Sequence, residues 1–112
     1  MKTFFCKLIP PRPLFGQDLT EVEMIAMREH ITHWTQAMEA GKVIAFGPVA
    51  DPKGFWGAGI VQVESDAELE EFTAKDPVML AGLGFRHETY LMPQIMIRAG
   101  VSEPENVALQ GS

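Results

Sequence analysis

The chain has little of what several protein classes require. Its single cysteine, Cys6, excludes an internal disulfide and a cysteine-rich zinc site. Nine Lys and Arg residues stand against 15 Asp and Glu, which gives a formal net charge of −6, and the basic residues form no run. Nucleic acids and anionic membrane surfaces attract clustered positive charge, so we expect neither as a partner. No secretory signal and no bilayer-spanning apolar run are visible, so we expect a cytoplasmic protein.

The length and composition are typical of one globular domain. The chain has 112 residues, of which 46% are hydrophobic and 21% are charged. We assign residues 1–98 to a single domain and residues 99–112 to a C-terminal tail. From Ser102 the tail is rich in Glu, Pro, Asn and Gly, which predicts frayed ends. Cys6 lies in a Phe-rich segment and is expected to be an inert buried thiol.

The first half of the chain predicts a strand and a long helix. Both faces of the strand Lys2–Ile9 are largely apolar, and three prolines then form a stiff connection. Thr20 begins the helix, Glu23 completes a capping box, and Gly41 is the expected stop. Apolar residues recur at spacings of three and four and predict a stripe facing the core: Met24, Met27, Ile31, Trp34 and Met38.

The second half predicts a hairpin, two short helices and a last strand. The hairpin joins Val43–Phe46, closed by Gly47-Pro48, to Ala58–Glu64. A helix is expected over Asp66–Ala74, capped by Ser65 and Glu68. Asp76 and Pro77 begin a helical turn over Val78–Leu80. The last strand is expected over Glu88–Ile97, where Pro93 requires an edge position or a bulge.

The order β-α-β-β-α-β predicts an α+β, ferredoxin-like fold, an antiparallel sheet with both helices on one face. The other face of the sheet is then uncovered, although its residues are apolar. On the first strand, Phe5 lies on the face opposite to that of Phe4. Further apolar residues near the end of the chain are Tyr90, Met92 and Ile95. A second copy of the chain is the simplest cover for such a face, so we expect a homodimer.

His30 and Asp51 are the candidate catalytic residues. His30 flanks the apolar stripe of the long helix, and Asp51 lies in the glycine-rich loop after the second strand. A histidine oriented by a carboxylate can transfer protons near neutral pH. Two simpler interpretations stay open. The hydrogen bond between the two residues could serve merely to hold the loop in place. An aspartate before Pro52 is also a common turn former.

The sequence gives weak support for metals and cofactors. His30 and His33 form a His-x-x-His pair, with Asp51 or His87 as a further ligand, but a second tight ligand pair is lacking. We therefore predict no metal. The glycine-rich loop leads into a strand rather than a helix and matches no nucleotide-binding fingerprint, so we predict no cofactor.

Four aromatic residues could wall a pocket for a small-molecule ligand: Trp34, Phe46, Phe55 and Trp56. For Trp34 and Phe46 an ordinary core position is the favoured interpretation. Phe55 and Trp56 lie in a loop, where two adjacent large apolar side chains need either a pocket or a partner subunit to cover them.

The chain resembles YCII-related proteins of the dimeric α+β barrel superfamily. The resemblance rests on the order of His30, Gly41, Gly47-Pro48, Asp51, Ser65, Asp76-Pro77 and Ala81-Gly82-Leu83. It implies a homodimer whose sheets pack face to face, with an active site made of His30 and Asp51. One relative in that family is a dehydrochlorinase of a chlorinated hydroxyaromatic compound. The stretch from Pro10 to Glu23 is longer than usual in the family and is expected to reshape the pocket.

These observations favour a small cofactor-independent enzyme. His30 would move a proton on a small organic substrate, cyclic or hydroxyaromatic, in a lyase or isomerase reaction, and Asp51 would orient it. The alternative is a non-catalytic homodimer that binds a small ligand or serves as an accessory protein. An accessible cleft with His30 at its base would favour the enzyme.

Overall fold

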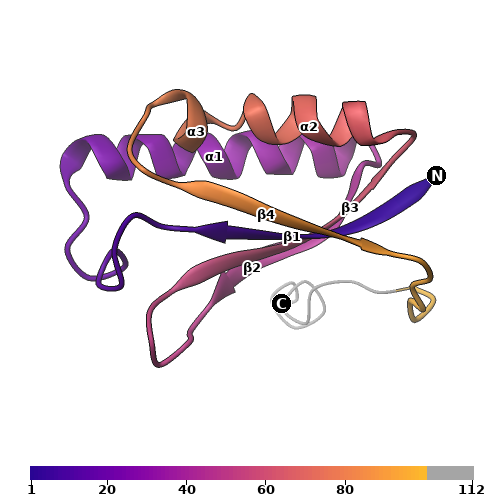
Figure 1. Ribbon diagram of the computed structural model, residues 1–112, viewed down its shortest axis with the longest axis horizontal. Helices are drawn as coiled ribbons and strands as arrows, with labels where there is room; N and C mark the ends of the chain where they lie inside the picture. Colours follow the sequence, from indigo (N-terminus) through magenta and orange to yellow (C-terminus); the bar gives the residue numbers. More distant parts are fainter. Residues whose placement is uncertain (101–112) are drawn as a thin grey trace.

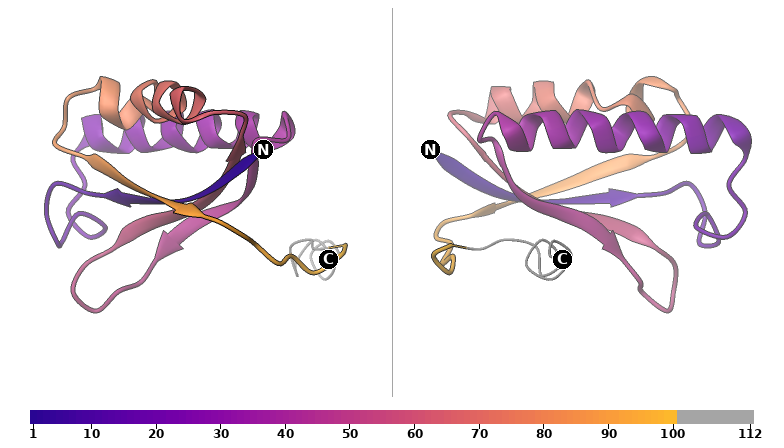
Figure 2. Two further views of the ribbon diagram at one scale, coloured as in Figure 1. Left: turned by 45° about the vertical axis from the view of Figure 1, so that its right-hand side comes forward. Right: turned by 180° about the vertical axis from the view of Figure 1, so that it is seen from behind.

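The fold is a four-stranded antiparallel sheet with three helices on one face, as Figures 1 and 2 show. The computed structural model describes residues 1–100, so most of the predicted tail lies outside the described residues. The strand order is β2-β3-β1-β4. The elements are β1 (Lys2–Ile9), α1 (Glu21–Glu39), β2 (Val43–Val49), β3 (Trp56–Val63), α2 (Asp66–Ala74), α3 (Pro77–Leu80) and β4 (Arg86–Met92). The predicted α+β, ferredoxin-like architecture is confirmed.

The strand boundaries correct the sequence prediction at several ends. β3 begins at Trp56 rather than Ala58, so Trp56 is a strand residue and not a loop residue, and β4 begins at Arg86 rather than Glu88. β2 does not close at Gly47-Pro48 but continues to Val49, because both residues still pair with β3. Proline is tolerated there since β2 is an edge strand. β4 ends at Met92 rather than Ile97, directly before Pro93, and it forms the other edge of the sheet. No helix of residues 1–100 is long and apolar enough to cross a membrane.

The orientation of α1 differs from the predicted one. The capping box forms as expected, with the Glu23 backbone N–H donating to the Thr20 hydroxyl. The buried residues of α1, however, are Glu23, Ala26, His30 and Trp34. Three members of the predicted stripe are substantially exposed: Met24 (42%), Ile31 (50%) and Met38 (37%). The helix is thus rotated from the predicted stripe towards His30, and the buried Asp76 carboxylate accepts hydrogen bonds from the inward-facing rings of His30 and Trp34.

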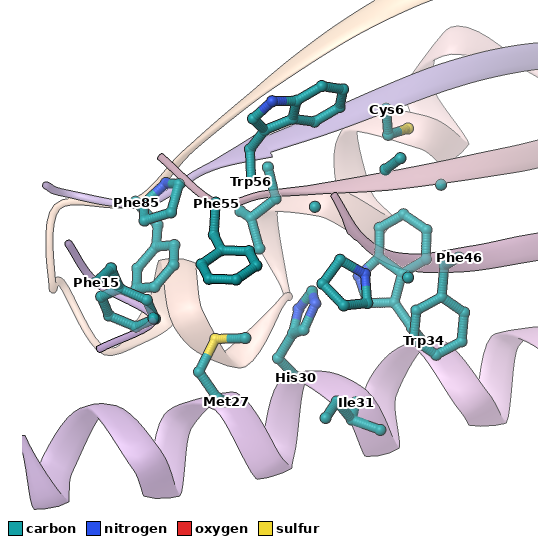
Figure 3. Close-up of a pocket in the computed structure, with 18 of the residues that line it drawn as sticks. Cys6, Phe15, Met27, His30, Ile31, Trp34, Phe46, Phe55, Trp56 and Phe85 are labelled. Carbon is teal, nitrogen blue, oxygen red and sulfur yellow. The ribbon is translucent and has the colours of Figure 1, made fainter. Parts of the chain in front are cut away.

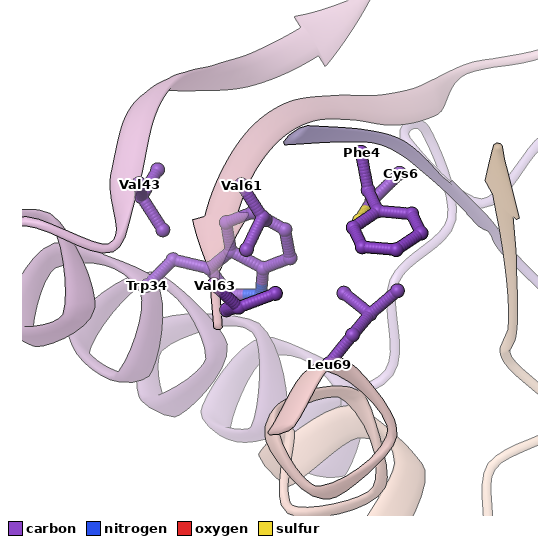
Figure 4. Packing of buried hydrophobic residues seen from close by; sticks show 7 residues of the cluster. All are labelled: Phe4, Cys6, Trp34, Val43, Val61, Val63 and Leu69. Atoms are coloured by element: carbon purple, nitrogen blue, oxygen red, sulfur yellow. The ribbon is translucent and has the colours of Figure 1, made fainter. Parts of the chain in front are cut away.

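The core lies between the inner face of the sheet and the helices, and Figure 4 shows its main cluster. This cluster contains Phe4, Cys6, Trp34, Val43, Val61, Val63 and Leu69. The inner positions of β3 alternate, and two of them, Gly57 and Gly59, have no side chain. A Cβ atom at Gly59 would overlap the Trp34 indole. The glycines therefore let the indole reach the sheet and leave open space beside it.

The long connection between β1 and α1 folds against one end of this space. Arg12 donates two hydrogen bonds of 2.7 Å to the Glu23 carboxylate, and it also contacts Asp18 at 2.9–3.0 Å. Phe15, in the same connection, packs edge-on against Phe85 with a ring separation of 4.9 Å. The connection is thus held in place at its start by an ion pair and in its middle by an apolar contact.

Candidate active site

A cavity of about 510 Å³ lies between α1 and the inner face of the sheet. Its wall is almost entirely apolar. Figure 3 shows ten of the lining residues by name, from both layers of the fold: Cys6, Phe15, Met27, His30, Ile31, Trp34, Phe46, Phe55, Trp56 and Phe85. Leu19 and Gly16 of the β1–α1 connection also line it, so this longer connection does shape the pocket. Apolar walls with a few polar groups are typical of small-molecule sites.

His30 is the main polar group on this wall. Its side chain is 11% exposed, and Figure 3 shows the ring projecting from α1 into the cavity. The Nδ1 atom lies 2.8 Å from both carboxylate oxygens of Asp76. No residue among 1–100 forms a hydrogen bond with Nε2. The imidazole is therefore held on one side and free on the side of the cavity.

Asp76 is the buried acceptor that orients this site. It is the N-cap of α3, is completely buried, and accepts from the Val78 backbone N–H. The Trp34 indole N–H also donates to it, at 2.8 Å, and His87 Nε2 lies 3.2 Å away. Burial alone raises the pKa of this carboxyl group, but the hydrogen bonds from the three rings outweigh it and hold the pKa below its ordinary value. Asp76 is thus an ionised carboxylate inside the core.

The predicted hydrogen bond between His30 and Asp51 is wrong, because Asp76 is the partner of His30. Asp51 accepts from the Lys53 backbone N–H at 2.9 Å and from the Trp56 indole N–H at 3.0 Å. These two hydrogen bonds lower the pKa of Asp51, the first more strongly. Asp51 therefore stabilises its own turn and orients the Trp56 indole on the outer face of the sheet, in line with the turn-forming interpretation of the sequence.

The four predicted ligand-binding aromatic residues do line the cavity. Trp34 also belongs to the core cluster and Phe46 packs against it. These two residues are therefore part of the core as well as of the cavity wall. Phe55 lies opposite α1, on the far wall of the cavity in Figure 3. The Trp56 indole points away from the cavity, to the outer face of the sheet, where it meets Phe5 and Lys7. Whether the four bind a ligand stays a prediction.

The two other histidines have roles that the sequence did not indicate. The Nε2 atom of His33 lies 3.0 Å from the Phe72 carbonyl oxygen, and the His33 ring stacks on Phe72. His87, which had no assigned role, lines the cavity and contacts Asp76. The described residues contain no group of three His, Cys, Asp or Glu that could hold a metal ion.

The sequence did not assign Asp76 and His87 to the candidate site. Asp76 followed by Pro77 signalled the start of a helix, and the structure confirms that role. Its second role depends on α1 and β4, which lie far from it in sequence. His87 lies one residue before the predicted last strand. Because β4 begins at Arg86, alternation along the strand puts His87 on the opposite face of the sheet from Arg86 and Glu88.

The fold and the site together define a small α+β protein with a buried carboxylate–histidine pair beside an apolar cavity. The YCII-related domain family matches residues 3–92, and the chain therefore belongs to the YCII-related family. Among solved structures, the chain is similar to 5-chloro-2-hydroxyhydroquinone dehydrochlorinase from Burkholderia phenoliruptrix AC1100, in complex with 2,5-dihydroxybenzoquinone. The TM-score is 0.58 and the identity 21%, over 82% of this chain and 93% of that one. No curated protein sequence matches the chain significantly.

Proposed function

We propose that this protein is a small-molecule enzyme that transfers a proton through Nε2 of His30. One observation carries the proposal: the ring is fixed by an ionised, buried carboxylate at Nδ1, while Nε2 faces an apolar cavity. Because Asp76 can only accept hydrogen bonds when ionised, Nδ1 carries the proton of the neutral ring. Nε2 then presents a lone pair to any molecule that enters.

In the proposed reaction His30 acts first as a base. Nε2 accepts a proton from a substrate hydroxyl or an activated C–H group, and the imidazolium that forms is stabilised by the Asp76 carboxylate. The electron pair left on the substrate either expels a leaving group or shifts a double bond. The proton can then return to the substrate from the same nitrogen. Elimination and isomerisation both fit this arrangement.

The cavity supports an aromatic or cyclic substrate with few charged groups. The titratable side chains on its wall are Cys6, His30 and His87, and burial raises the pKa of the Cys6 thiol to about 12, so it stays neutral. A charged group would find no counter-ion on this wall. The structural neighbour acts on a chlorinated hydroxyhydroquinone, which is flat, compact and rich in hydroxyl groups. A hydroxylated ring of this type would place a hydroxyl group on Nε2 of His30.

The first test uses the compounds of that neighbour as probes. Chloride release from 5-chloro-2-hydroxyhydroquinone and binding of 2,5-dihydroxybenzoquinone are measured for the wild type, His30→Gln and Asp76→Asn. We expect His30→Gln to lose about a hundredfold or more of the turnover while still folding. His33→Gln is the matched control, because His33 lies one turn further on the same helix, and its ring bonds and stacks on Phe72 of α2 and does not line the cavity.

The outcome also separates the enzyme from the alternative of a non-catalytic binder. Binding of the quinone without turnover, and unchanged by His30→Gln, would support a binding protein and contradict the proposal. Full activity of His30→Gln would contradict it as well. If neither probe is bound, hydroxylated rings are the wrong class of substrate.

We also propose that the protein forms a homodimer through the outer face of its sheet. This face carries Phe5, which stacks on Tyr90 and meets Trp56 edge-on, and the helices do not cover it. Tyr90 is exposed. An apolar face of this kind is stabilised when a two-fold partner buries it.

A further inference from the structure

The environment of His87 differs from that of His30 although both rings contact one carboxylate. His87 comes from β4, opposite Leu8 of β1, and its side chain is 6% exposed. Its Nε2 lies 3.2 Å from Oδ2 of Asp76. Its Nδ1 is buried and has no hydrogen-bond partner among residues 1–100. An unpaired buried nitrogen beside a candidate active site requires a physical explanation.

The position of the proton on His87 follows from the fact that the Asp76 carboxylate can only accept hydrogen bonds. The Trp34 indole can only donate, so Oδ2 of Asp76 is an acceptor. His87 meets the same oxygen, and its Nε2 must therefore carry a proton. In the neutral ring Nδ1 is then a bare lone pair, which is less costly to bury than an unpaired N–H group.

Adding a second proton has opposite consequences for the two histidines. Protonated His87 would bury both a positive charge and an N–H group that no described residue accepts. Protonated His30 would direct its new N–H group into the cavity, where water or a ligand can accept it. The structure thus favours one of the two rings as the proton acceptor.

We propose that His87 is a positioning residue that stays neutral, with its proton on Nε2. Its hydrogen bond to Asp76 weakens the interaction between that carboxylate and His30. His87 thereby limits how strongly His30 retains a proton. This inference rests on the proposed function, because it concerns the same base. A donor on Oδ2 draws negative charge from the carboxylate. Removing that donor leaves more charge to stabilise the His30 imidazolium.

The other groups near the two rings do not compete for this role. Of the β1 residues on the cavity wall, Cys6 is the titratable one, and burial raises its pKa to about 12. The wall residues from β2 and β3 are not titratable. On β4 the neighbours Arg86 and Glu88 lie on the other face of the sheet and bond each other at 2.8 Å. On α1 the next histidine, His33, is turned to the Phe72 carbonyl oxygen.

The test is an NMR titration of the imidazole ¹⁵N and ring protons of the full chain, which needs no substrate. In the wild type we expect His87 to keep the single proton on Nε2, because a proton on its buried Nδ1 would have no acceptor, and we expect His30 to be the ring of the pair that takes up a second proton. His87→Leu removes the donor and should raise the pKa of His30 by roughly half a unit or more. His87→Gln keeps an N–H donor and should lie closer to the wild type. His33→Gln is the control and should leave the pKa of His30 in place.

Two results would overturn the inference. One is protonation of His87 together with His30 in the wild type. The other is an unchanged pKa of His30 in folded His87→Leu. If His87→Leu does not fold, the wild-type titration of His87 still decides. The pH profile of turnover is a separate readout, since its acidic limb should follow the pKa of His30 in each variant. If the protein proves to have no enzymatic activity, the NMR titration still tests the roles of His87 and His30.

Discussion

His30 and Asp76 are 46 positions apart in sequence, yet the imidazole Nδ1 lies 2.8 Å from both oxygens of the carboxylate. The contact joins the middle of α1 to the turn that begins α3. Asp76 therefore has two roles, since it caps α3 and holds the ring of His30. A substitution of Asp76 is therefore expected to affect both the stability of the fold and the proposed proton transfer.

Asp76→Asn should reduce both stability and turnover. The amide offers one acceptor oxygen in place of two, and its NH₂ group would face ring N–H donors. We expect a loss of about 1–3 kcal/mol in the free energy of unfolding, because at least one buried donor is left unpaired. Urea denaturation measures the change. Asp51→Asn is the matched comparison and should cost less than about 1 kcal/mol, because its carboxylate is only partly buried. Equal losses from both substitutions would contradict the assigned roles.

Stability in acid should depend on Glu23. Hydrogen bonds from Arg12 are the main cause that lowers the pKa of Glu23 from 4.5 to about 2. Since the folded-state pKa lies below the ordinary value, this contribution is complete above about pH 4.5 and is lost as the pH falls towards 2. The melting temperatures of wild type and Glu23→Gln should therefore converge over that range. Glu21→Gln, exposed in the same helical turn, is the control. A constant difference between wild type and Glu23→Gln would count against this ion pair.

Gly59→Ala should destabilise the fold, because its methyl group would overlap the Trp34 indole and force the ring away from Asp76. We expect a cost of about 1–3 kcal/mol, as for other overpacked cores. Gly47→Ala tests the same substitution in the neighbouring strand, where nothing lies within 4 Å of the added Cβ. Thermal melting with tryptophan fluorescence measures both. If the two variants melt alike, the close approach of the indole is not what requires glycine at position 59.

The proposed homodimer predicts a mass of twice 12.4 kDa in light scattering. Phe5→Lys places a charge in the middle of the outer sheet face and should give a monomer. Leu80→Lys changes an exposed residue of α3, on the opposite side of the sheet, and should leave the dimer intact. A stable dimer should bury about 1,000 Å² or more. A wild-type monomer at micromolar concentration would refute the proposal.

Local patterns determined most of the fold. Capping residues at Thr20 and Ser65 and the Asp76-Pro77 start of α3 placed the helix starts within about a residue, because capping is decided by neighbours three or fewer positions apart. Strand ends were less accurate. Pro48 looked like a terminator, but an edge strand does not need its missing N–H group.

The sequence by itself determined which helix carries the candidate base, and it named Trp34, Phe46 and Phe55 as aromatic residues near it, but not Phe15 and Phe85. The carboxylate partner was decided only by the tertiary structure. Asp51 and Asp76 each looked like a turn or cap residue, and nothing local distinguishes them. Packing against the sheet rotates α1 so that His30 and Trp34 face inward, and their buried N–H groups require an acceptor at that depth. Asp76 lies there, whereas Asp51 bonds within its own loop.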